Sequence, residues 1–260
     1  MRPLLLGLVF SFLAMPALAC QLTLQGPAKQ GGLLIGSAPA GAKVSVDGRA
    51  VRVAPDGRFL VGFGRDAKVK TKVLALTSDG HTLACPVVIA KRTYQVQRID
   101  GLPKRQVTPD PVAIARIKKD NAAIGRVRRL DTASTDFAAP FIWPVKGRIS
   151  GIFGSQRILN GKPRSPHNGV DIAAPKGTPI VAPAPGVVAL VHPDMFYTGK
   201  SVMLDHGHGL SSVYVHMSDI SVKQGQRVAK GEMIGKVGKT GRATGPHLHW
   251  GVSLFATHLD

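Results

Sequence analysis

The sequence predicts a mainly β protein with an N-terminal small β-sandwich, a basic linker helix and a C-terminal antiparallel β domain. Three observations support this fold class. The 260 residues include 30 Gly and 19 Pro, and aromatic residues make up only 5%. Short apolar segments alternate with turn sequences in both halves. Such a chain is typical of many short strands, and its length suffices for two modest cores.

Residues 1–19 have the pattern of a secretory signal peptide. A basic start precedes an apolar run over residues 4–15, and small residues stand at the −3 and −1 positions before Cys20. We therefore expect cleavage before Cys20 and export to the periplasm or the cell envelope. The alternative is a membrane anchor, but a bilayer span needs about 20 apolar residues and this run is shorter.

Residues 20–100 are predicted to form the β-sandwich. The turn signals Asp47-Gly48, Asp56-Gly57 and Asp79-Gly80 separate short apolar segments, at a spacing that suits a small sandwich. No catalytic cluster is evident there, so we interpret this domain as a spacer or binding module. The apolar segments are residues 33–35, 43–46, 58–61, 73–76 and 87–89.

Both cysteines of the chain, Cys20 and Cys85, lie in the N-terminal half. In an oxidising compartment they would close one disulfide, which constrains the unfolded chain. The alternative is lipid modification of Cys20, because residues 17–20 imperfectly resemble a lipoprotein processing site, and this would leave Cys85 free. We favour the disulfide because it accounts for both cysteines.

Residues 101–140 are predicted to be a basic helical linker. Between residues 109 and 130, apolar positions recur at helical spacing and are separated by lysines and arginines. This pattern favours one amphipathic helix between the two halves. Its basic face either contacts wall polymer or lipid or is simply solvated, and a solvated face is the commoner outcome. Residues 131–139 are small and polar, as in a linker.

The chain is strongly basic, with 34 Lys plus Arg against 15 acidic residues and a formal net charge of +19. Such a charge attracts polyanions, whether nucleic acid, anionic lipid or an acidic wall polymer. Export favours an anionic wall polymer or a membrane surface as the partner. Nucleic acid is not expected, because no aromatic-rich RNA-binding signature accompanies the basic residues.

Residues 141–260 are predicted to form the compact antiparallel β domain. Turns such as Pro185-Gly186 interrupt short strands, and no helix-length periodic run occurs. Eight of the nine histidines follow residue 160, which indicates a site in this half. His206 and His208 occupy a predicted hairpin tip, where histidines are usually solvated.

Four other residues have the spacing of metal ligands. His167 and Asp171 are four residues apart, and His247 and His249 are two apart. On extended strands, side chains at these spacings share a face. Two imidazoles and one carboxylate suit a catalytic zinc site, which leaves a fourth position open to water. Four candidates for three positions leave one residue for proton transfer.

The general base is predicted to be a histidine. Many zinc peptidases use a glutamate for this role, but the one glutamate after residue 131, Glu232, lies in a turn with no ligand beside it. Histidine suits proton transfer near neutral pH, because its unperturbed pKa is about 6.5. His216, at the end of an alternating strand, and His247 are the candidates.

These motifs together resemble the lysostaphin-type, or LytM-like, family of peptidoglycan metalloendopeptidases, also called peptidase family M23. The similarity covers about residues 143–255 and rests on residues 165–175, 214–216 and 244–249. The resemblance implies a LytM-like peptidase domain, small and mainly antiparallel, with one Zn²⁺ per chain in a groove. Its substrate would be peptidoglycan.

The resemblance also implies a role for each motif residue. His167, Asp171 and His249 would hold the zinc ion, while His216 and His247 would stabilise or deprotonate the reacting water. The polar residues just before His167 would border the groove and meet substrate carboxylates, although ordinary loop solvation is an equal alternative. These polar residues are Arg157, Asn160 and Arg164.

The sequence therefore favours an exported zinc metalloendopeptidase that hydrolyses peptide bonds in peptidoglycan stem peptides or cross-bridges, for wall remodelling. An alternative is a non-catalytic wall-binding activator of amidases, because some members of the family have lost ligands. All five motif positions are filled here, which favours activity. A third hypothesis is a protein that only binds polyanions, whose affinity would fall steeply with salt.

Overall fold

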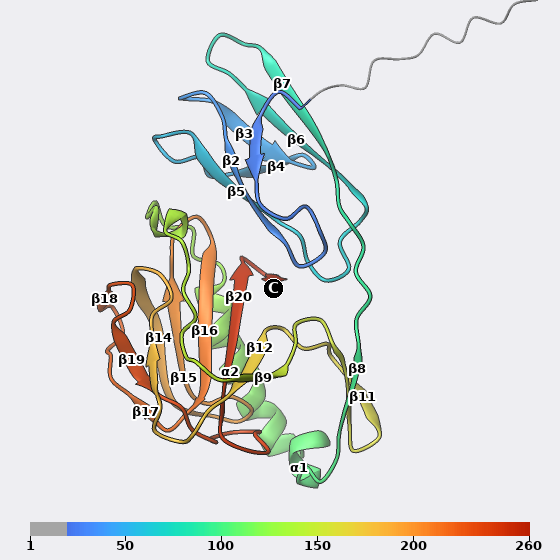
Figure 1. Cartoon of the computed structure of the whole chain (residues 1–260), viewed down its shortest axis with the longest axis vertical. Coiled ribbons are helices and arrows are strands. Elements are labelled where there is room, and N and C mark those ends of the chain that lie inside the picture. Colours follow the sequence, from blue (N-terminus) through green and yellow to red (C-terminus); the bar gives the residue numbers. More distant parts are fainter. Residues whose placement is uncertain (1–19) are drawn as a thin grey trace, which may run out of the picture.

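The computed structural model describes residues 20–260 (Figure 1). The predicted signal peptide, residues 1–19, lies outside the described residues. Two β-rich parts follow each other along the long axis of the molecule, and the N-terminal part is drawn in blue and teal. The prediction of a mainly β fold is confirmed. Within residues 20–260, none of the helices combines the length and the apolar character that a membrane crossing needs.

The N-terminal part consists of two small antiparallel sheets that share one core. Phe59 and Val73, one from each sheet, are fully buried in it. Asp47 and Gly48 both have positive φ, as a tight hairpin turn between β3 and β4 requires. Cys20 and Cys85 are joined as a disulfide. The sheets are β1(Thr23–Gln25)-β2(Leu33–Ser37)-β5(Arg58–Gly62) and β4(Arg49–Val51)-β3(Lys43–Val46)-β6(Lys70–Leu76)-β7(Thr82–Val88).

A long connection leads from the first part to the second. It begins with β8 (Val96–Ile99), which pairs in parallel with β10 (Gln156–Leu159), and β11 (Lys162–Arg164) completes this three-stranded sheet. The short helix α1 (Lys104–Val107) follows. In Figure 1 this connection runs down one side of the molecule to the end farthest from the N-terminal sheets.

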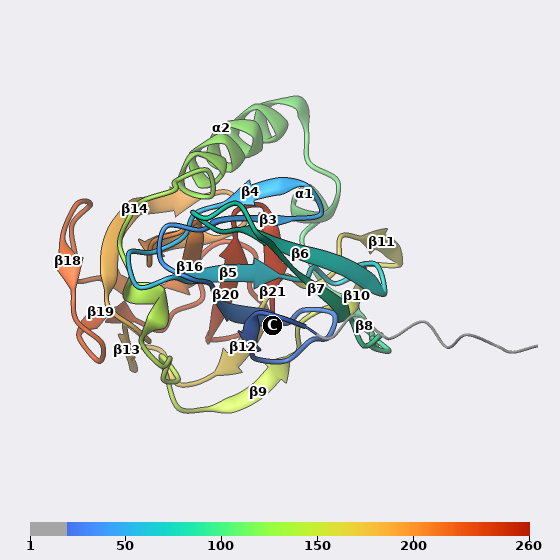
Figure 2. The same ribbon diagram turned by 90° about the horizontal axis from the view of Figure 1, so that it is seen from above.

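Helix α2 (Pro111–Val127) lies within the range predicted for the amphipathic helix. Pro111 occupies its first turn, and the Asp110 side chain accepts a hydrogen bond from Ala113 N, which caps the helix. The buried Asp120 accepts a hydrogen bond from Phe196 N at 2.8 Å. The helix therefore packs on the outside of the C-terminal sheet, beside β14, as the view from above shows (Figure 2). A 3₁₀ turn (Asp136–Ala138) follows it.

The C-terminal part is built on an eight-stranded antiparallel sheet. Ile172, Tyr214 and Leu248 bury its inner face against a second, three-stranded sheet. The large sheet has the order β18(Arg227–Val228)-β14(Gly186–Met195)-β15(Gly199–Asp205)-β16(Leu210–Met217)-β20(His247–Leu254)-β12(Val170–Ala173)-β9(Arg148–Gly151), with β21(Thr257–Leu259) also paired to β20. The small sheet is β13(Pro179–Val181)-β19(Met233–Lys236)-β17(Asp219–Ile220).

Candidate metal centre and active site

Strand pairing brings together motifs that are far apart in the chain. Strands β12 and β20 are neighbours, and their register places Asp171 directly opposite His249. Residues directly opposite in an antiparallel pair point to the same face. On the other side of β12, Gly151 faces Asp171, and a side chain at residue 151 would collide with the Asp171 carboxylate. The glycine therefore leaves room for this carboxylate.

Three side-chain atoms converge at this point of the sheet. His167 Nε2 lies 2.8 Å from His249 Nδ1, and Asp171 Oδ1 lies 3.0 Å from the first and 2.8 Å from the second. Ligands about 2.1 Å from a tetrahedral zinc ion are about 3.4 Å apart, so small outward shifts of these atoms would admit one ion. Two imidazole nitrogens and one carboxylate oxygen are the donor set that catalytic zinc prefers.

Hydrogen bonds fix the imidazole of His167 for this role. Its Nδ1–H donates to the Ile152 carbonyl oxygen at 3.1 Å, because a carbonyl can only accept. The unprotonated Nε2 is thereby left to face the other two ligand atoms. An outer hydrogen bond of this kind is usual for metal-ligating histidines, since it sets the tautomer and the ring orientation.

The charge state of Asp171 also suits a ligand. Burial raises the pKa of the Asp171 carboxyl, but the adjacent imidazoles of His167 and His249 outweigh burial and hold this pKa below its usual range. The side chain is therefore an ionised carboxylate at neutral pH. Its second oxygen, Oδ2, accepts a hydrogen bond from Arg157 Nη2 at 2.8 Å.

His216 and His247 form a second pair of imidazoles beside the ligand cluster. Their ring centroids are 4.7 Å apart, and His247 Nε2 lies 3.9 Å from Asp171 Oδ1. Burial, with the charges of His247 and His249, lowers the pKa of His216 to about 3. His216 is therefore neutral near pH 7 and can accept a proton.

Backbone carbonyls orient both of these rings. Nδ1–H of His216 donates to the Thr240 carbonyl at 2.8 Å, and Nδ1–H of His247 donates to the Gly245 carbonyl at 2.9 Å. In each ring the Nε2 atom is left as a proton acceptor. His216 has a φ of 63°, and this left-handed backbone breaks the alternation of β16 just where the side chain must leave the strand.

A pocket of about 170 Å³ adjoins these histidines. One wall contains Asp171, His216 and His247. Residues 96–108, which we call the strap, also contribute to the lining. The strap residues that line the pocket are Gln97, Ile99 and Leu102, and the other lining residues include Ser150, Arg157, Leu159 and Arg242.

Two of the three polar residues predicted to meet substrate instead hold the strap. The Asn160 amide accepts a hydrogen bond from Leu102 N at 3.1 Å and donates one to Leu102 O at 2.7 Å. Arg164 Nη2 donates to Val107 O at 2.7 Å. Arg157 does line the pocket, where it is paired with Asp171. Sequence reasoning missed Arg242, whose position five residues before His247 was its only signal.

The prediction that His206 and His208 are solvated is wrong. Their exposed fractions are 0% and 4%. His206 is held by the Pro185 carbonyl and the Ser212 hydroxyl, and His208 stacks against Phe137. The hairpin that carries them is covered by the segment that follows α2, since His208 N donates to Thr132 O.

Comparison with known proteins places the site in a family. Residues 165–260 match the model of peptidase family M23. The peptidoglycan DD-endopeptidase ShyA of Vibrio cholerae is 45% identical over 108 residues, which are 40% of this chain and 24% of that protein. The cell division protein DipM of Caulobacter vibrioides is 32% identical over 154 residues, covering 59% of this chain and 24% of that protein. The matched region thus spans about a quarter of the length of these relatives.

A solved structure matches nearly the whole chain. A crystal structure from Pseudomonas aeruginosa, assigned to peptidase M23, is 31% identical and has a TM-score of 0.69. The match covers 90% of this chain and 92% of that chain, so it includes both β-rich parts. The resemblance drawn from the histidine motifs is confirmed, and zinc is the cofactor that fits the His-Asp-His cluster. The chain therefore belongs to peptidase family M23.

Proposed function

We propose that this protein is an exported zinc metalloendopeptidase that hydrolyses peptide bonds in peptidoglycan stem peptides or cross-bridges, for wall remodelling. The observation that best supports this proposal is the convergence of three ligand atoms from β12, the loop before it and β20, with two further imidazoles beside them. His167, Asp171 and His249 would hold the ion. When bound, zinc supplies a Lewis acid that polarises a carbonyl group and lowers the pKa of water.

His216 and His247 would move the protons of the reaction. In each neutral ring the Nδ1–H is held by a backbone carbonyl, so Nε2 is the proton acceptor. A positioned base of this kind takes a proton from the attacking water and, as its conjugate acid, returns a proton to the leaving amine. Burial lowers the pKa of His216, so the imidazole is in its unprotonated form at neutral pH.

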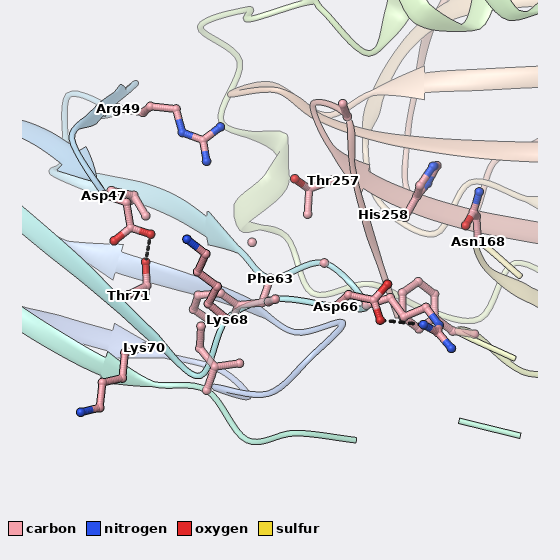
Figure 3. A pocket seen from close by; sticks show the side chains of 18 of the residues that line it. Asp47, Arg49, Phe63, Asp66, Lys68, Lys70, Thr71, Asn168, Thr257 and His258 are labelled. Carbon is pink, nitrogen blue, oxygen red and sulfur yellow. Dashed lines mark hydrogen bonds and ion pairs between the residues drawn. The ribbon is translucent and has the colours of Figure 1, made fainter. Parts of the chain in front are cut away.

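Peptidoglycan is the proposed substrate, and an anionic wall polymer is the proposed partner of the basic surface. A cavity of about 640 Å³ lies between the N-terminal sheets and the loop before β12. Figure 3 shows Arg49 of β4 and Lys68 of the loop before β6 among the side chains that line this cavity from the N-terminal part. Within residues 20–260, neither these two cations nor Lys70 forms an ion pair. A concave, positively charged site fits an anionic polymer chain better than a flat membrane surface.

Export is supported by the first domain. The disulfide between Cys20 and Cys85 requires an oxidising compartment. The intact mass of the mature protein tests this point, since a diacylglyceryl increment on Cys20 would establish the lipid-modified alternative.

The division into residues 20–100, 101–140 and 141–260 stays a prediction. Strand β8, at the first boundary, pairs with β10 of the C-terminal part.

Digestion of purified murein tests the function. We expect the mature protein to release new amino termini from sacculi, EDTA to abolish this release, and zinc to restore it. Protein that contains zinc and releases no amino termini from any murein would overturn the proposal. It would then favour the alternative, a non-catalytic wall-binding activator of amidases, and mass spectrometry of the muropeptides would identify the bond if cleavage occurs.

A further inference from the structure

Arg242 lies in the loop between β19 and β20 and lines the pocket beside the ligand cluster. The guanidinium carbon lies 4.2 Å from the centre of the Tyr197 ring. Its Nη1 donates to Gln106 O, at 3.1 Å, in the strap. Of the five N–H donors of the guanidinium, this is the only one with an acceptor among residues 20–260.

The positive charge of Arg242 is not compensated. Within residues 20–260, no carboxylate lies within ion-pairing distance of it, whereas the nearby Arg157 is paired with Asp171. Burial lowers the pKa of Arg242, and the charges of Arg157 and Arg164 add to this effect. A half-buried cation without an anionic partner is costly, and an incoming carboxylate would reduce that cost.

The strap contributes to the lining of the pocket around Arg242. It is held by hydrogen bonds from two different segments. Asn160 and Arg164 hold it from the β10–β11 hairpin, and Arg242 holds it from the opposite loop. Arg242 lines the same pocket of about 170 Å³ as Asp171 and His216, so a peptide whose scissile bond lies at the ligand cluster would pass within a short distance of Arg242.

We propose that Arg242 binds a carboxylate of the substrate peptide close to the scissile bond, so that the enzyme selects stem peptides carrying a free carboxylate there. This inference rests on the proposed peptidase function. The carboxylate is either the C-terminus of a stem peptide or an acidic side chain within it. Arg242 would therefore determine substrate specificity, and proton transfer by His216 and His247 would not depend on it.

Kinetics with one substrate in two forms test the proposal. The substrate is a purified cross-linked muropeptide dimer, and the second form is the same dimer with its carboxylates amidated. For Arg242→Gln we expect KM for the native dimer to rise about ten- to a hundredfold, with kcat changed much less and zinc content unchanged. The amidated dimer should be cleaved equally by wild type and variant.

Arg126→Gln is the matched control, because Arg126 is an exposed arginine of α2 and its substitution makes the same change in net charge. It should behave as wild type on both substrates. The proposal is overturned if Arg242→Gln lowers kcat/KM for the native and amidated dimers by the same factor. A merely structural role of Arg242 would produce that equal loss.

A binding measurement separates this inference from the proposed function. Two zinc-loaded proteins are compared, His216→Ala and the double variant His216→Ala with Arg242→Gln. Each is titrated with three forms of the stem tetrapeptide: the free acid, the C-terminal amide, and a form in which only the side-chain carboxylates are amidated. We expect one amidated form to bind about tenfold more weakly, and only when Arg242 is present. Equal binding of all three forms overturns the carboxylate site. If one amidated form binds more weakly as expected but the wild type cleaves no dimer, the proposed peptidase function is refuted and the carboxylate site is still supported.

Discussion

Arg157 is the residue that links the ligand cluster to the rest of the pocket. Its Nη2 lies 2.8 Å from Asp171 Oδ2, while Asp171 Oδ1 faces the two imidazoles. The guanidinium thereby fixes the rotation of the carboxylate and directs one oxygen toward the metal position. Arg157 had been predicted to meet substrate, and its pairing with Asp171 points instead to positioning of a ligand.

Substitution of Arg157 should therefore weaken zinc binding. We expect Arg157→Gln to lower zinc affinity about ten- to a hundredfold, the usual effect of removing the hydrogen-bond partner of a metal ligand. Competition with a zinc chelator measures this affinity. Arg164→Gln, which removes a nearby guanidinium that binds only backbone carbonyls, is the control and should bind zinc as wild type does. Equal affinity of wild type and Arg157→Gln would refute this role.

His206 makes the stability of the C-terminal part depend on pH. Burial lowers the pKa of His206, although the Pro185 carbonyl and nearby carboxylates partly oppose the shift. In the unfolded chain this imidazole protonates near pH 6.5. Below that pH the unfolded state binds more protons than the folded state, so stability falls as pH falls.

We expect the free energy of unfolding of wild type to drop between pH 7 and pH 5 more than that of His206→Gln. Urea unfolding at each pH measures the difference. His81→Gln is the control, because the His81 side chain is 80% exposed, and it should follow the wild-type curve. Parallel curves for wild type and His206→Gln would show that His206 does not contribute.

At the scale of elements, the strands decide which motifs meet. The spacings of His167 with Asp171 and of His247 with His249 could be read from the sequence, because side-chain alternation along a strand is a local property. The pairing of β12 with β20 is a long-range contact, so its register was not available from the motifs. A slip by one residue would turn Asp171 and His249 to opposite faces.

Other features were hidden from the sequence for related reasons. By alternation, His216 would share the face of Tyr214, which lies in the core, and only its left-handed φ takes the imidazole to the active site. The polar loop residues Asn160 and Arg164 looked free to bind substrate, because nothing local showed that a segment more than fifty residues earlier uses their hydrogen bonds. His206 is likewise buried by the segment that follows α2, which is far from it in the sequence.

The strap is an element whose position depends on a few hydrogen bonds. Asn160 has a φ of 46°, so Asn160→Gly keeps the backbone unstrained while removing both bonds to Leu102. We expect the Leu102 amide to exchange its hydrogen about tenfold faster in this variant, since each bond contributes about 0.5–1.5 kcal/mol. Hydrogen-exchange mass spectrometry measures the rate. An unchanged rate would mean that other contacts hold the strap.

At the scale of the whole molecule, basic side chains line the cavity where the two parts meet. Arg49, Lys68 and Lys70 of the N-terminal part line the cavity of Figure 3, next to the loop that contains the ligand His167. An anionic polymer held there would keep the catalytic part close to the wall. The first domain would then act as a binding module.

Neutralising these three cations should weaken binding to sacculi and flatten its dependence on salt. The triple change of Arg49, Lys68 and Lys70 to Gln is made in the His216→Ala background to avoid cleavage, and binding is measured by co-sedimentation at increasing salt. The same number of charges is removed in the control, Lys118, Lys119 and Arg126 to Gln, on the exposed face of α2. If the control weakens binding as much, the cavity has no special role.

Both active-site proposals depend on one arrangement of three side chains. Diffraction from crystals of the zinc-loaded protein at the zinc absorption edge tests it most directly. The account predicts one anomalous peak per chain, about 2.0–2.2 Å from His167 Nε2, Asp171 Oδ1 and His249 Nδ1, with His216 and His247 beside it but not bound. A peak elsewhere, or one that lacks any of these three ligands, would contradict the account.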